Sequence, residues 1–433
     1  MSKVMNFAKF KNINWLLFFY LLLLTQGVFF LKFLAFPLFF LLNKDRFTLV
    51  TIFGKQYKFY LFIIIYAILT SSVLLFINFS LQYLVMILLG IITWILCLTN
   101  NLVINFNVKK NSLKKLYATI DFLFDFNILL SFVQYLIMMI EYKTINPFTS
   151  QLGTSAGDSI KGIFANSSVN MIVCSFAFIF YYSNKKTFKA IFNIVVMFLT
   201  TYMSGILIFF SIFSIFIFFA SKLVLYKKVL IVFAALIIGV LFYSLSKENI
   251  DYAIMIGNTV LEDIPPRKIT SFEQTFQNAS SNISTLIFGS GMGNFSSRLA
   301  FIAGGEYVSW YPALLIKRAD VFHNNHFQLW NYEVLSVPFS DGTANQPFSV
   351  FNQLIGEYGI IGTLIFLFFY LRSYFFNVLK NKYSRFFLFL LLGFMFLDYW
   401  FEYFSVIVFF ELISSYWQKK TFEEKSVLST FKN

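Results

Sequence analysis

The chain has 433 residues, of which 58% are hydrophobic and 21% aromatic, while only 12% are charged. A soluble domain is about half apolar and a quarter charged, so this composition excludes an ordinary soluble protein and indicates an integral membrane protein. The apolar runs are continuous rather than alternating, which favours helical spans over a β-barrel. The net charge of +14 does not indicate nucleic-acid binding, because Lys and Arg form short clusters between the apolar runs, as in cytoplasmic loops.

The basic clusters divide the chain into cytoplasmic segments and apolar runs. The first apolar run follows a basic N-terminus and lacks a small-residue cleavage site, so we interpret it as a retained span rather than a signal peptide. The charge rule predicts cytoplasmic segments at about 1–13, 43–58, 101–116, 184–189, 222–228, 372–386 and 417–433.

Three apolar runs of about 30 residues, 13–42, 190–221 and 386–416, begin and end at cytoplasmic clusters. A helix of that length spans about 45 Å, too long for one upright crossing and short for two. We expect hairpins or short tilted pairs that turn outside at "TQGVFFLK", "TTYMSG" and "DYWFE". The predicted fold is an all-α polytopic helical bundle of about twelve spans, roughly 11 to 14, with both termini cytoplasmic.

Two segments are left on the external side. The shorter covers about 141–168, and the longer covers 246–351 and contains turn sequences such as "IPPR" and "SDGTANQP". A loop of that length in a compact membrane protein is usually functional. The chain is therefore expected to contain a bundle at 1–245, a large external loop at 246–351, and further spans with a cytoplasmic tail at 352–433.

The only two histidines, His323 and His326, lie together in the large loop, in "RADVFHNNHFQLWNYE". Three residues apart, they would share one face of a helix. A zinc site is disfavoured because no third ligand lies at a suitable spacing, so no metal is expected. An imidazole is well suited as a general base at neutral pH. We favour that role for His323, and hydrogen bonding within the loop for His326.

The large loop also holds three of the six arginines, Arg267, Arg298 and Arg318. A planar guanidinium binds phosphate or carboxylate with two parallel hydrogen bonds, which indicates an anionic ligand. Surface ion pairs with the loop's own acidic residues are the alternative, and such pairs are common and weak.

Two glycine-rich stretches and several acids complete the candidates. The backbone amides of "FGSGMGNF" (288–295) could bind an anion, although a plain turn is the commoner meaning of such a sequence. In "IGEYGIIG", Gly356, Gly359 and Gly362 form a stripe that permits close helix packing, beside Glu357 near the external mouth. Acids in or near apolar spans are functional candidates by default. They are Asp121, Asp125, Asp398, Glu402 and Glu411.

Four stretches together resemble the O-antigen polymerase and O-antigen ligase superfamily. They are "HNNHFQLW" (323–330), "GEYGIIGTLIFL" (356–367), "LIFGSGMGNF" (286–295) and "KGIFANSSVNM" (161–171), in which Lys161 stands where the family commonly has Arg. The resemblance is best over about 160–400. The distance from His323-Asn324 to Gly359 is about 25 residues longer than in ligases, which favours a polymerase.

The resemblance implies a GT-C-like enzyme that joins undecaprenyl-diphosphate-linked oligosaccharide repeats at the periplasmic face of a bacterial inner membrane, without metal or cofactor. Catalytic roles would fall to His323, which orients or deprotonates the acceptor hydroxyl, and to Arg298 and Arg318 at the diphosphate. Its implied substrate-binding residues here are Lys161, Arg267, Asn324, His326 and Glu357. The implied partners are the lipid-linked donor and acceptor, membrane lipid, a chain-length regulator and a flippase.

Other functions remain open. The ligase of the same superfamily would transfer the finished polymer to lipid A-core. A flippase or transporter of lipid-linked oligosaccharide would be expected to show repeats, interrupted helices and charges along a path. A non-enzymatic scaffold would have little use for Arg and His gathered in one loop. We favour the enzyme.

Overall fold

The structure is a computed structural model that describes residues 11–25, 57–77, 80–143, 145–146, 160–220, 265–303, 318–336, 346–378 and 382–430, together with Pro37 and scattered residues between 224 and 258. Every regular element in these ranges is a helix, which confirms the predicted all-α class.

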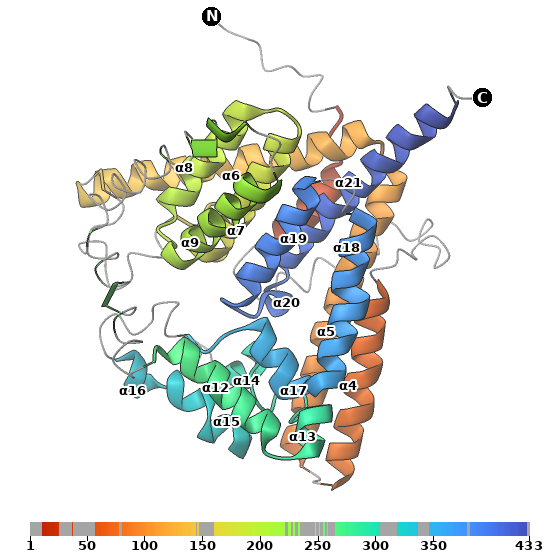
Figure 1. The fold of residues 1–433 in the computed structure, drawn as a ribbon, viewed down its shortest axis with the longest axis vertical. Coiled ribbons are helices and arrows are strands. Elements are labelled where there is room, and N and C mark those ends of the chain that lie inside the picture. The colour runs from red at the N-terminus through yellow and green to blue at the C-terminus, as the bar shows by residue number, and fades with distance from the viewer. Residues whose placement is uncertain are drawn as a thin grey trace, which may run out of the picture.

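Most of these helices form one bundle (Figure 1). The pairs α4 and α5, α7 and α8, and α19 and α9 pack side by side, and α21 packs on both α5 and α7. The bundle elements are α2 (Trp15–Thr25), α4 (Tyr57–Ile77), α5 (Leu81–Lys110), α6 (Leu113–Tyr142), α7 (Ser167–Ser183), α8 (Thr187–Leu199), α9 (Met203–Ile215), η4 (Phe216–Ala220), α17 (Val350–Ile365), η6 (Phe366–Leu371), α18 (Arg372–Val378), α19 (Lys382–Met395), α20 (Trp400–Tyr403) and α21 (Ser405–Thr430).

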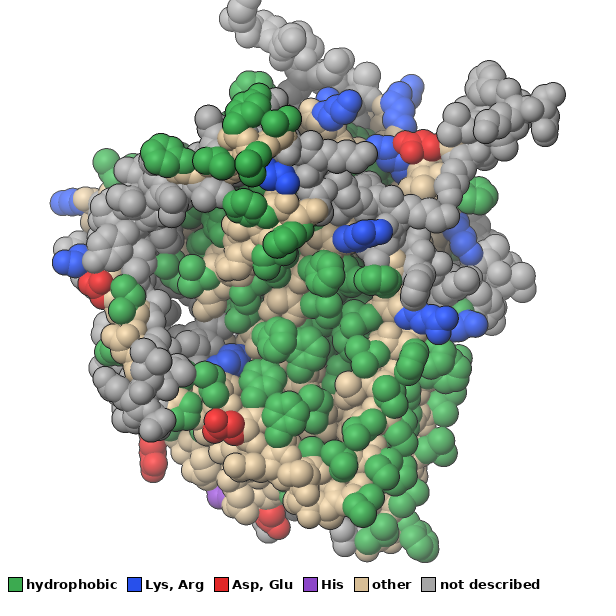
Figure 2. Space-filling view, in the orientation of Figure 1, with side chains coloured by type: hydrophobic (Ala, Val, Ile, Leu, Met, Phe, Trp, Pro, Cys, Tyr) green, Lys and Arg blue, Asp and Glu red, His purple; other side chains and the backbone are tan. Residues whose placement is uncertain are grey.

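In the described part of the chain, four helical stretches are long and apolar enough to cross a membrane, namely α4, α5, α6 and the run Val350–Phe375. The outward face of α4 is apolar, and Phe76 is 92% exposed there. Figure 2 shows hydrophobic side chains over α4, α17 and α18. Most of the Lys and Arg side chains visible in this view lie in the half of the molecule towards which α21 runs. A soluble protein would not leave such a surface in water, so the chain is a helical membrane protein. The number of spans, about twelve, stays a prediction.

The long apolar runs are broken where polar turns were predicted. Within 190–221, α8 ends at Leu199 and α9 begins at Met203, so "TTYMSG" separates two helices. Within 386–416, "DYWFE" lies between α19 and α21 and contains the single turn α20. The turn "TQGVFFLK" lies outside the described residues beyond Thr25.

The described parts of the large loop form short helices that we call the cap. These are α12 (Arg267–Ser280), α13 (Ile283–Phe288), α14 (Arg298–Ala303), α15 (Asp320–Asn324), η5 (His326–Leu329) and α16 (Tyr332–Leu335). Helices α12 and α13 pack on α17, and α14 packs on α5. In Figure 1 the cap lies at the end of the molecule opposite to the one towards which α21 runs.

Two hydrophobic cores hold these parts together. The larger core runs through the bundle around α7 and α21. The side chains of α21 are almost all buried from Ser405 to Trp417. The smaller lies beneath the cap and consists of Ala300, Phe301, Phe322, Phe327, Trp330, Phe348 and Tyr399. Because Tyr399 comes from the turn before α21, this core joins the cap to the bundle.

Helix α17 is interrupted at Gly359, whose φ of 63° and ψ of −162° are not helical. The interruption frees backbone carbonyls, which are costly in an apolar setting unless they are bonded. The loop amides of Ser290 and Gly291 donate to the oxygens of Gly356 (2.8 Å) and Glu357 (3.1 Å). The Tyr66 hydroxyl donates to the oxygen of Tyr358 at 2.9 Å. The broken helix is therefore fully supported by its neighbours.

Candidate functional site

The histidine window does not form one continuous helix. Helix α15 ends at Asn324, and Asn325, with φ −118° and ψ −103°, separates it from η5. The expectation that His323 and His326 share a helical face is therefore not met. His323 is exposed, as is Asn324, whereas His326 is fully buried.

The aromatic ring of Phe327 brings Arg318 and His323 together at the surface of the cap. The guanidinium carbon of Arg318 lies 3.7 Å from the centre of this ring. The His323 imidazole stacks on it at 5.3 Å with an angle of 23° between the planes. Cation–π contact orients a guanidinium and leaves its edge able to donate hydrogen bonds. We call Arg318, His323 and Phe327 the surface cluster.

His326 links η5 to α12. Its Nε2 lies 2.9 Å from the oxygen of Ser271 and 3.3 Å from the hydroxyl of Thr275, and its ring packs on Phe295 at 4.6 Å. Burial lowers the pKa of His326 to about 4, the Ser271 oxygen opposes that shift, and the charge of Lys268 adds to it. The imidazole is thus neutral at pH 7 and donates a hydrogen bond to the oxygen of Ser271. This bond joins η5 to α12, so His326 holds the cap in place.

The glycine-rich loop binds an anion that belongs to the protein itself. The amide of Gly293 donates to one oxygen of Glu357 at 2.9 Å. The amides of Phe295 (3.4 Å) and Ser296 (3.0 Å) donate to the other. Successive backbone N–H groups form such anion-binding concavities. The loop is therefore an anion nest rather than the plain turn that the sequence favoured, and the side chain of Glu357, only 1% exposed, fills it.

Two of the three glycines of α17 permit this arrangement. A Cβ on Gly356 would lie 2.1 Å from the ring of Phe295, and a Cβ on Gly359 would lie 2.6 Å from the backbone of Gly289. Gly362 faces Tyr358 of its own helix. The lack of a side chain at Gly356 and Gly359 thus allows the loop to pack closely against α17.

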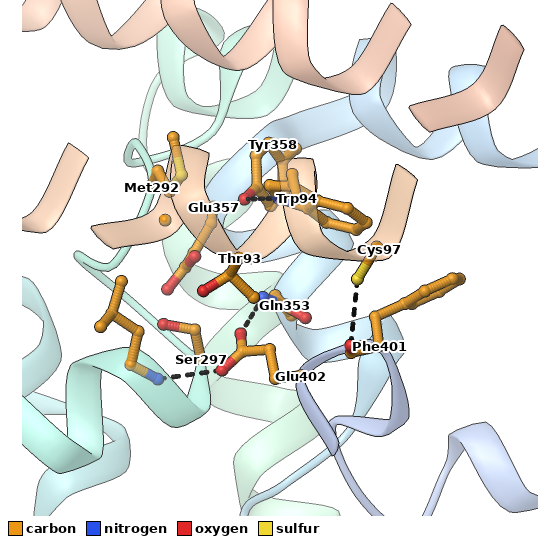
Figure 3. Close-up of a pocket in the computed structure, with 12 residues that line it drawn as sticks. Thr93, Trp94, Cys97, Met292, Ser297, Gln353, Glu357, Tyr358, Phe401 and Glu402 are labelled. Atoms are coloured by element: carbon orange, nitrogen blue, oxygen red, sulfur yellow. Dashed lines mark hydrogen bonds between the residues drawn. The ribbon is translucent and has the colours of Figure 1, made fainter. Parts of the chain in front are cut away.

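A second carboxylate, Glu402 of α20, faces the same small pocket as Glu357 (Figure 3). Its Oε2 accepts from the amide of Leu299 at 3.0 Å, and its Oε1 accepts from Nε2 of Gln353 at 2.5 Å. Burial, followed by the charge of Glu357, raises the pKa of Glu402 to about 8. Residues of α5, the cap, α17 and α20 complete the pocket: Gly90, Thr93, Trp94, Cys97, Met292, Ser297, Leu299, Gln353, Tyr358 and Phe401.

Of two cations of the cap, Arg298 lies near Glu402 of this pocket and Lys268 lies near Asp398. Arg298 stacks its guanidinium 3.9 Å from the ring centre of Tyr403, and its charge opposes the rise in the pKa values of Glu402 and Asp398. Nζ of Lys268 donates to the oxygens of Phe348 (2.6 Å) and Leu397 (3.2 Å). Burial lowers the pKa of Lys268 to about 7, against the charge of Asp398.

The remaining candidates lie apart from both clusters. Arg267 begins α12 and is half-buried. Lys161 is exposed, and its backbone amide donates to Oε1 of Gln134 on α6 at 2.9 Å. Among the described residues no hydrogen bond, ion pair or ring contact joins Lys161 to the cap. The segment 160–166 is instead held by α6, where Oδ1 of Asn127 accepts from the amide of Ile163 at 3.0 Å.

Sequence reasoning flagged Glu402 and Asp398 only as acids near a span, and it gave Lys268 no role. The signal that could have found them is the composition of "DYWFE", which places two acids and three aromatics in one predicted external turn. In the structure that turn lies directly beneath α14 and its Arg298.

No family model matches the chain, and neither a curated protein nor a solved structure shows significant similarity to it. The resemblance to the O-antigen superfamily therefore stays a prediction, and the function is argued below from the geometry.

Proposed function

We propose that this protein is a membrane glycosyltransferase of GT-C-like architecture that polymerises undecaprenyl-diphosphate-linked oligosaccharide repeats at the outer face of a bacterial inner membrane. The observation that carries the proposal is the charge of the cap. The guanidinium carbons of Arg298, at the start of α14, and Arg318, just before α15, lie 3.9 and 3.7 Å from the centre of an aromatic ring, in the cap that covers one end of an apolar bundle. Oriented guanidinium groups above a lipid-facing bundle suit a substrate with a diphosphate head and a polyprenyl tail.

The reaction requires little from the protein beyond charge and position. The acceptor hydroxyl attacks the anomeric carbon, the bond from that carbon to the diphosphate oxygen breaks, and the diphosphate leaves with the electron pair. Arg318 and Arg298 would neutralise the charge that develops on the leaving oxygen, which is commonly a large part of catalysis. His323 would take the hydroxyl proton, because it is the exposed imidazole of the surface cluster.

The two carboxylates of the pocket would position other groups of the site rather than attack the substrate. Both oxygens of Glu402 already accept hydrogen bonds, and its pKa of about 8 keeps it largely protonated at neutral pH. Glu357 is enclosed by loop amides and is not accessible to substrate. The two side chains fix the loop and α14, and so fix Arg298.

A flippase or transporter is the second candidate, favoured by the interruption of α17 at Gly359. Interrupted helices in transporters expose carbonyl groups to a substrate or ion. Here the carbonyls of Gly356, Glu357 and Tyr358 already accept hydrogen bonds from the loop and from Tyr66. The interruption thus supports the cap, and we rank transport second.

The test is to replace His323→Ala and Arg318→Ala in the native bacterium, with Glu273→Gln as a matched control that removes an exposed charge from α12 of the same cap. Membrane abundance is checked first, and surface polysaccharide and lipid-linked intermediates are then analysed. We expect single repeats in place of the ladder, and a normal ladder in the control.

The other outcomes separate the alternatives. Full-length polymer that stays on the lipid would indicate a ligase. Lipid-linked repeats trapped on the cytoplasmic face would indicate a flippase. A normal ladder in both variants would remove the surface cluster from catalysis.

A further inference from the structure

Helix α4 shows where the lipid lies relative to the cap. It has 21 residues, and its only charged side chain is Lys58 in the first turn. At 1.5 Å per residue the helix is about 31 Å long, which just matches a hydrocarbon layer of about 30 Å. Its second half is exposed at Leu69, Val73 and Phe76. The end of α4 at Ile77 therefore lies near the border of the lipid on the cap side.

The cap contacts the middle of α4 rather than its end. The hydroxyl of Tyr66 lies within hydrogen-bond distance of the oxygen of Phe288, at the end of α13 (3.2 Å), and of the oxygen of Tyr358 on α17 (2.9 Å). Tyr66 precedes Ile77 by 11 residues. That distance along a helix is about 16 Å, or half of the hydrocarbon layer. The end of α13 thus lies deep within the span of α4.

Helix α5 gives a similar depth for the glycine-rich loop. An added Cβ on Gly90 would lie 2.0 Å from Sδ of Met292, so the loop touches α5 at this residue. Gly90 comes nine residues after Leu81, where α5 begins, which is about 14 Å along the helix. In Figure 1 the cap accordingly lies alongside one half of α4 and not beyond its end. Irregular backbone is tolerated at such a depth where protein bonds it, as Glu357 bonds the loop amides.

The outward surface of α12 and α13 is apolar where it adjoins the bundle. Ile269 and Phe276 of α12 are exposed, and Phe272 between them packs at 5.8 Å on Phe396, which is also exposed. Hydrophobic side chains cover much of the surface between α12 and α19 (Figure 2). No side chain of α13 is buried, and Ile283 is 75% exposed. These residues extend the apolar surface of the bundle onto the cap.

Helix α12 is divided lengthwise into three stripes. Successive residues of a helix turn by about 100°, which places Ile269, Phe272 and Phe276 on one stripe. Glu273 and Gln277 lie on the next stripe and are exposed. The third stripe, which includes Ser271, Thr275 and Ala279, is buried against the rest of the protein. A helix with one apolar and one polar outward side is typical of a membrane surface.

We propose that the cap is set into the lipid leaflet on its side of the membrane, with α13 and the apolar stripe of α12 in contact with acyl chains. Ile360 and Leu364 are exposed on α17, against which α13 packs, so the lipid-facing surface of α17 continues onto α13. The same acyl chains that cover α4 and α17 would therefore cover α13, and the polar stripe of α12 would face water. The inference does not depend on the proposed glycosyl transfer.

The test is the accessibility of spin labels on the full-length protein in nanodiscs of phosphatidylethanolamine and phosphatidylglycerol. Nitroxides are attached to Phe276→Cys and Leu286→Cys, with Glu273→Cys on the polar stripe of α12 as the matched control. Leu69→Cys on α4 is the reference for a position in lipid. Both native cysteines are buried, so the wild type labelled in parallel gives the background.

Collisions with oxygen, which concentrates in lipid, are compared with collisions with a water-soluble nickel chelate. We expect the ratio of oxygen to nickel collisions at Phe276→Cys and Leu286→Cys to approach that at Leu69→Cys, and to exceed that at Glu273→Cys several-fold. Ile269→Cys and Ile283→Cys probe the same two surfaces should a first variant lose thermal stability.

Two results would overturn the proposal. Frequent collisions with nickel at Phe276→Cys and Leu286→Cys, equal to those at Glu273→Cys, would show that water surrounds the cap. Rare collisions with both reagents would show that a protein surface, from a second copy or another partner, covers α12 and α13.

Discussion

The surface cluster lies on the cap and the carboxylate pocket lies where the cap meets the bundle, and the two are built in opposite ways. Arg318 and His323 rest on one ring, and His323 is exposed to solvent. Glu357 is buried and Glu402 is partly buried, and each of their four carboxylate oxygens accepts a hydrogen bond. A side chain with all its bonds made within the protein holds structure, whereas an oriented and exposed one remains able to bind a substrate.

This contrast separates two measurable quantities. Changes in the carboxylate pocket should lower stability first and activity as a consequence. Changes in the surface cluster should lower activity and leave stability almost unchanged. The predictions below run from the largest expected effect on stability to the smallest.

The largest effect is expected for Glu357→Ala. The substitution leaves the buried amides of Gly293, Phe295 and Ser296 without an acceptor. Unsatisfied buried donors should cost about 3 kcal/mol or more in the free energy of unfolding. The measurement is the midpoint of thermal unfolding of the purified protein in detergent, with Glu273→Gln as the control. A midpoint equal to that of the wild type would show that the loop does not depend on this carboxylate.

A smaller loss of stability is expected for Gly359→Ala. The residue has a φ of 63°, and an added Cβ would lie 2.6 Å from backbone atoms of Ile287 and Gly289, which cannot move aside as a side chain can. We expect a loss of about 2 kcal/mol in the free energy of unfolding. The control is Gly393→Ala on α19, where the nearest atoms are methyl groups at the ends of the Ile208 and Ile212 side chains. Equal melting temperatures for both variants would argue against the tight approach of loop and helix.

Much of the architecture could be predicted because it follows from local signals. Polar residues inside long apolar runs marked the turn at Thr200–Thr201 and the turn after Met395, since a helix in lipid rarely keeps such a cluster in its middle. The loop "FGSGMGNF" was recognised as able to bind an anion, because its glycines permit the positive φ angles that Gly289, Gly291 and Gly293 adopt.

The partners of these groups could not be predicted, because they come from distant parts of the chain. Glu357 meets amides 61 to 64 residues away, and Glu402 meets one 103 residues away. The fates of the two histidines depend on the single residue Asn325, which ends α15 and turns His326 inward. Spacing alone predicted a shared face, and the backbone at one position decided otherwise.

The pH dependence of stability tests whether His326 is buried as the structure shows. His326 has a pKa of about 4 in the folded state, below its ordinary value of 6.5, so the unfolded chain binds more protons between these values. Its contribution to stability is complete above pH 6.5 and is lost as the pH falls towards 4. Against His326→Gln, which keeps a donor for Ser271, the wild-type melting temperature should fall more steeply in that window. Parallel curves would place His326 in contact with water.

The smallest effect on stability, and the largest on activity, is expected for His323→Ala. The ring is exposed and stacks on Phe327 from the solvent side, so its removal should change the free energy of unfolding by about 0.5 kcal/mol or less. If it takes the acceptor proton, polymer formation should fall about 100-fold or more, and His323→Gln should not restore it, because an amide cannot act as a base at neutral pH. The readout is the ratio of single repeats to long chains at equal membrane abundance. Full activity in His323→Ala, with low activity in Arg318→Ala, would leave the guanidinium as the working group of the surface cluster. In that case the guanidinium of Arg318 would act on the substrate, the enclosed carboxylates of Glu357 and Glu402 would hold the fold, and the reaction would need no histidine base.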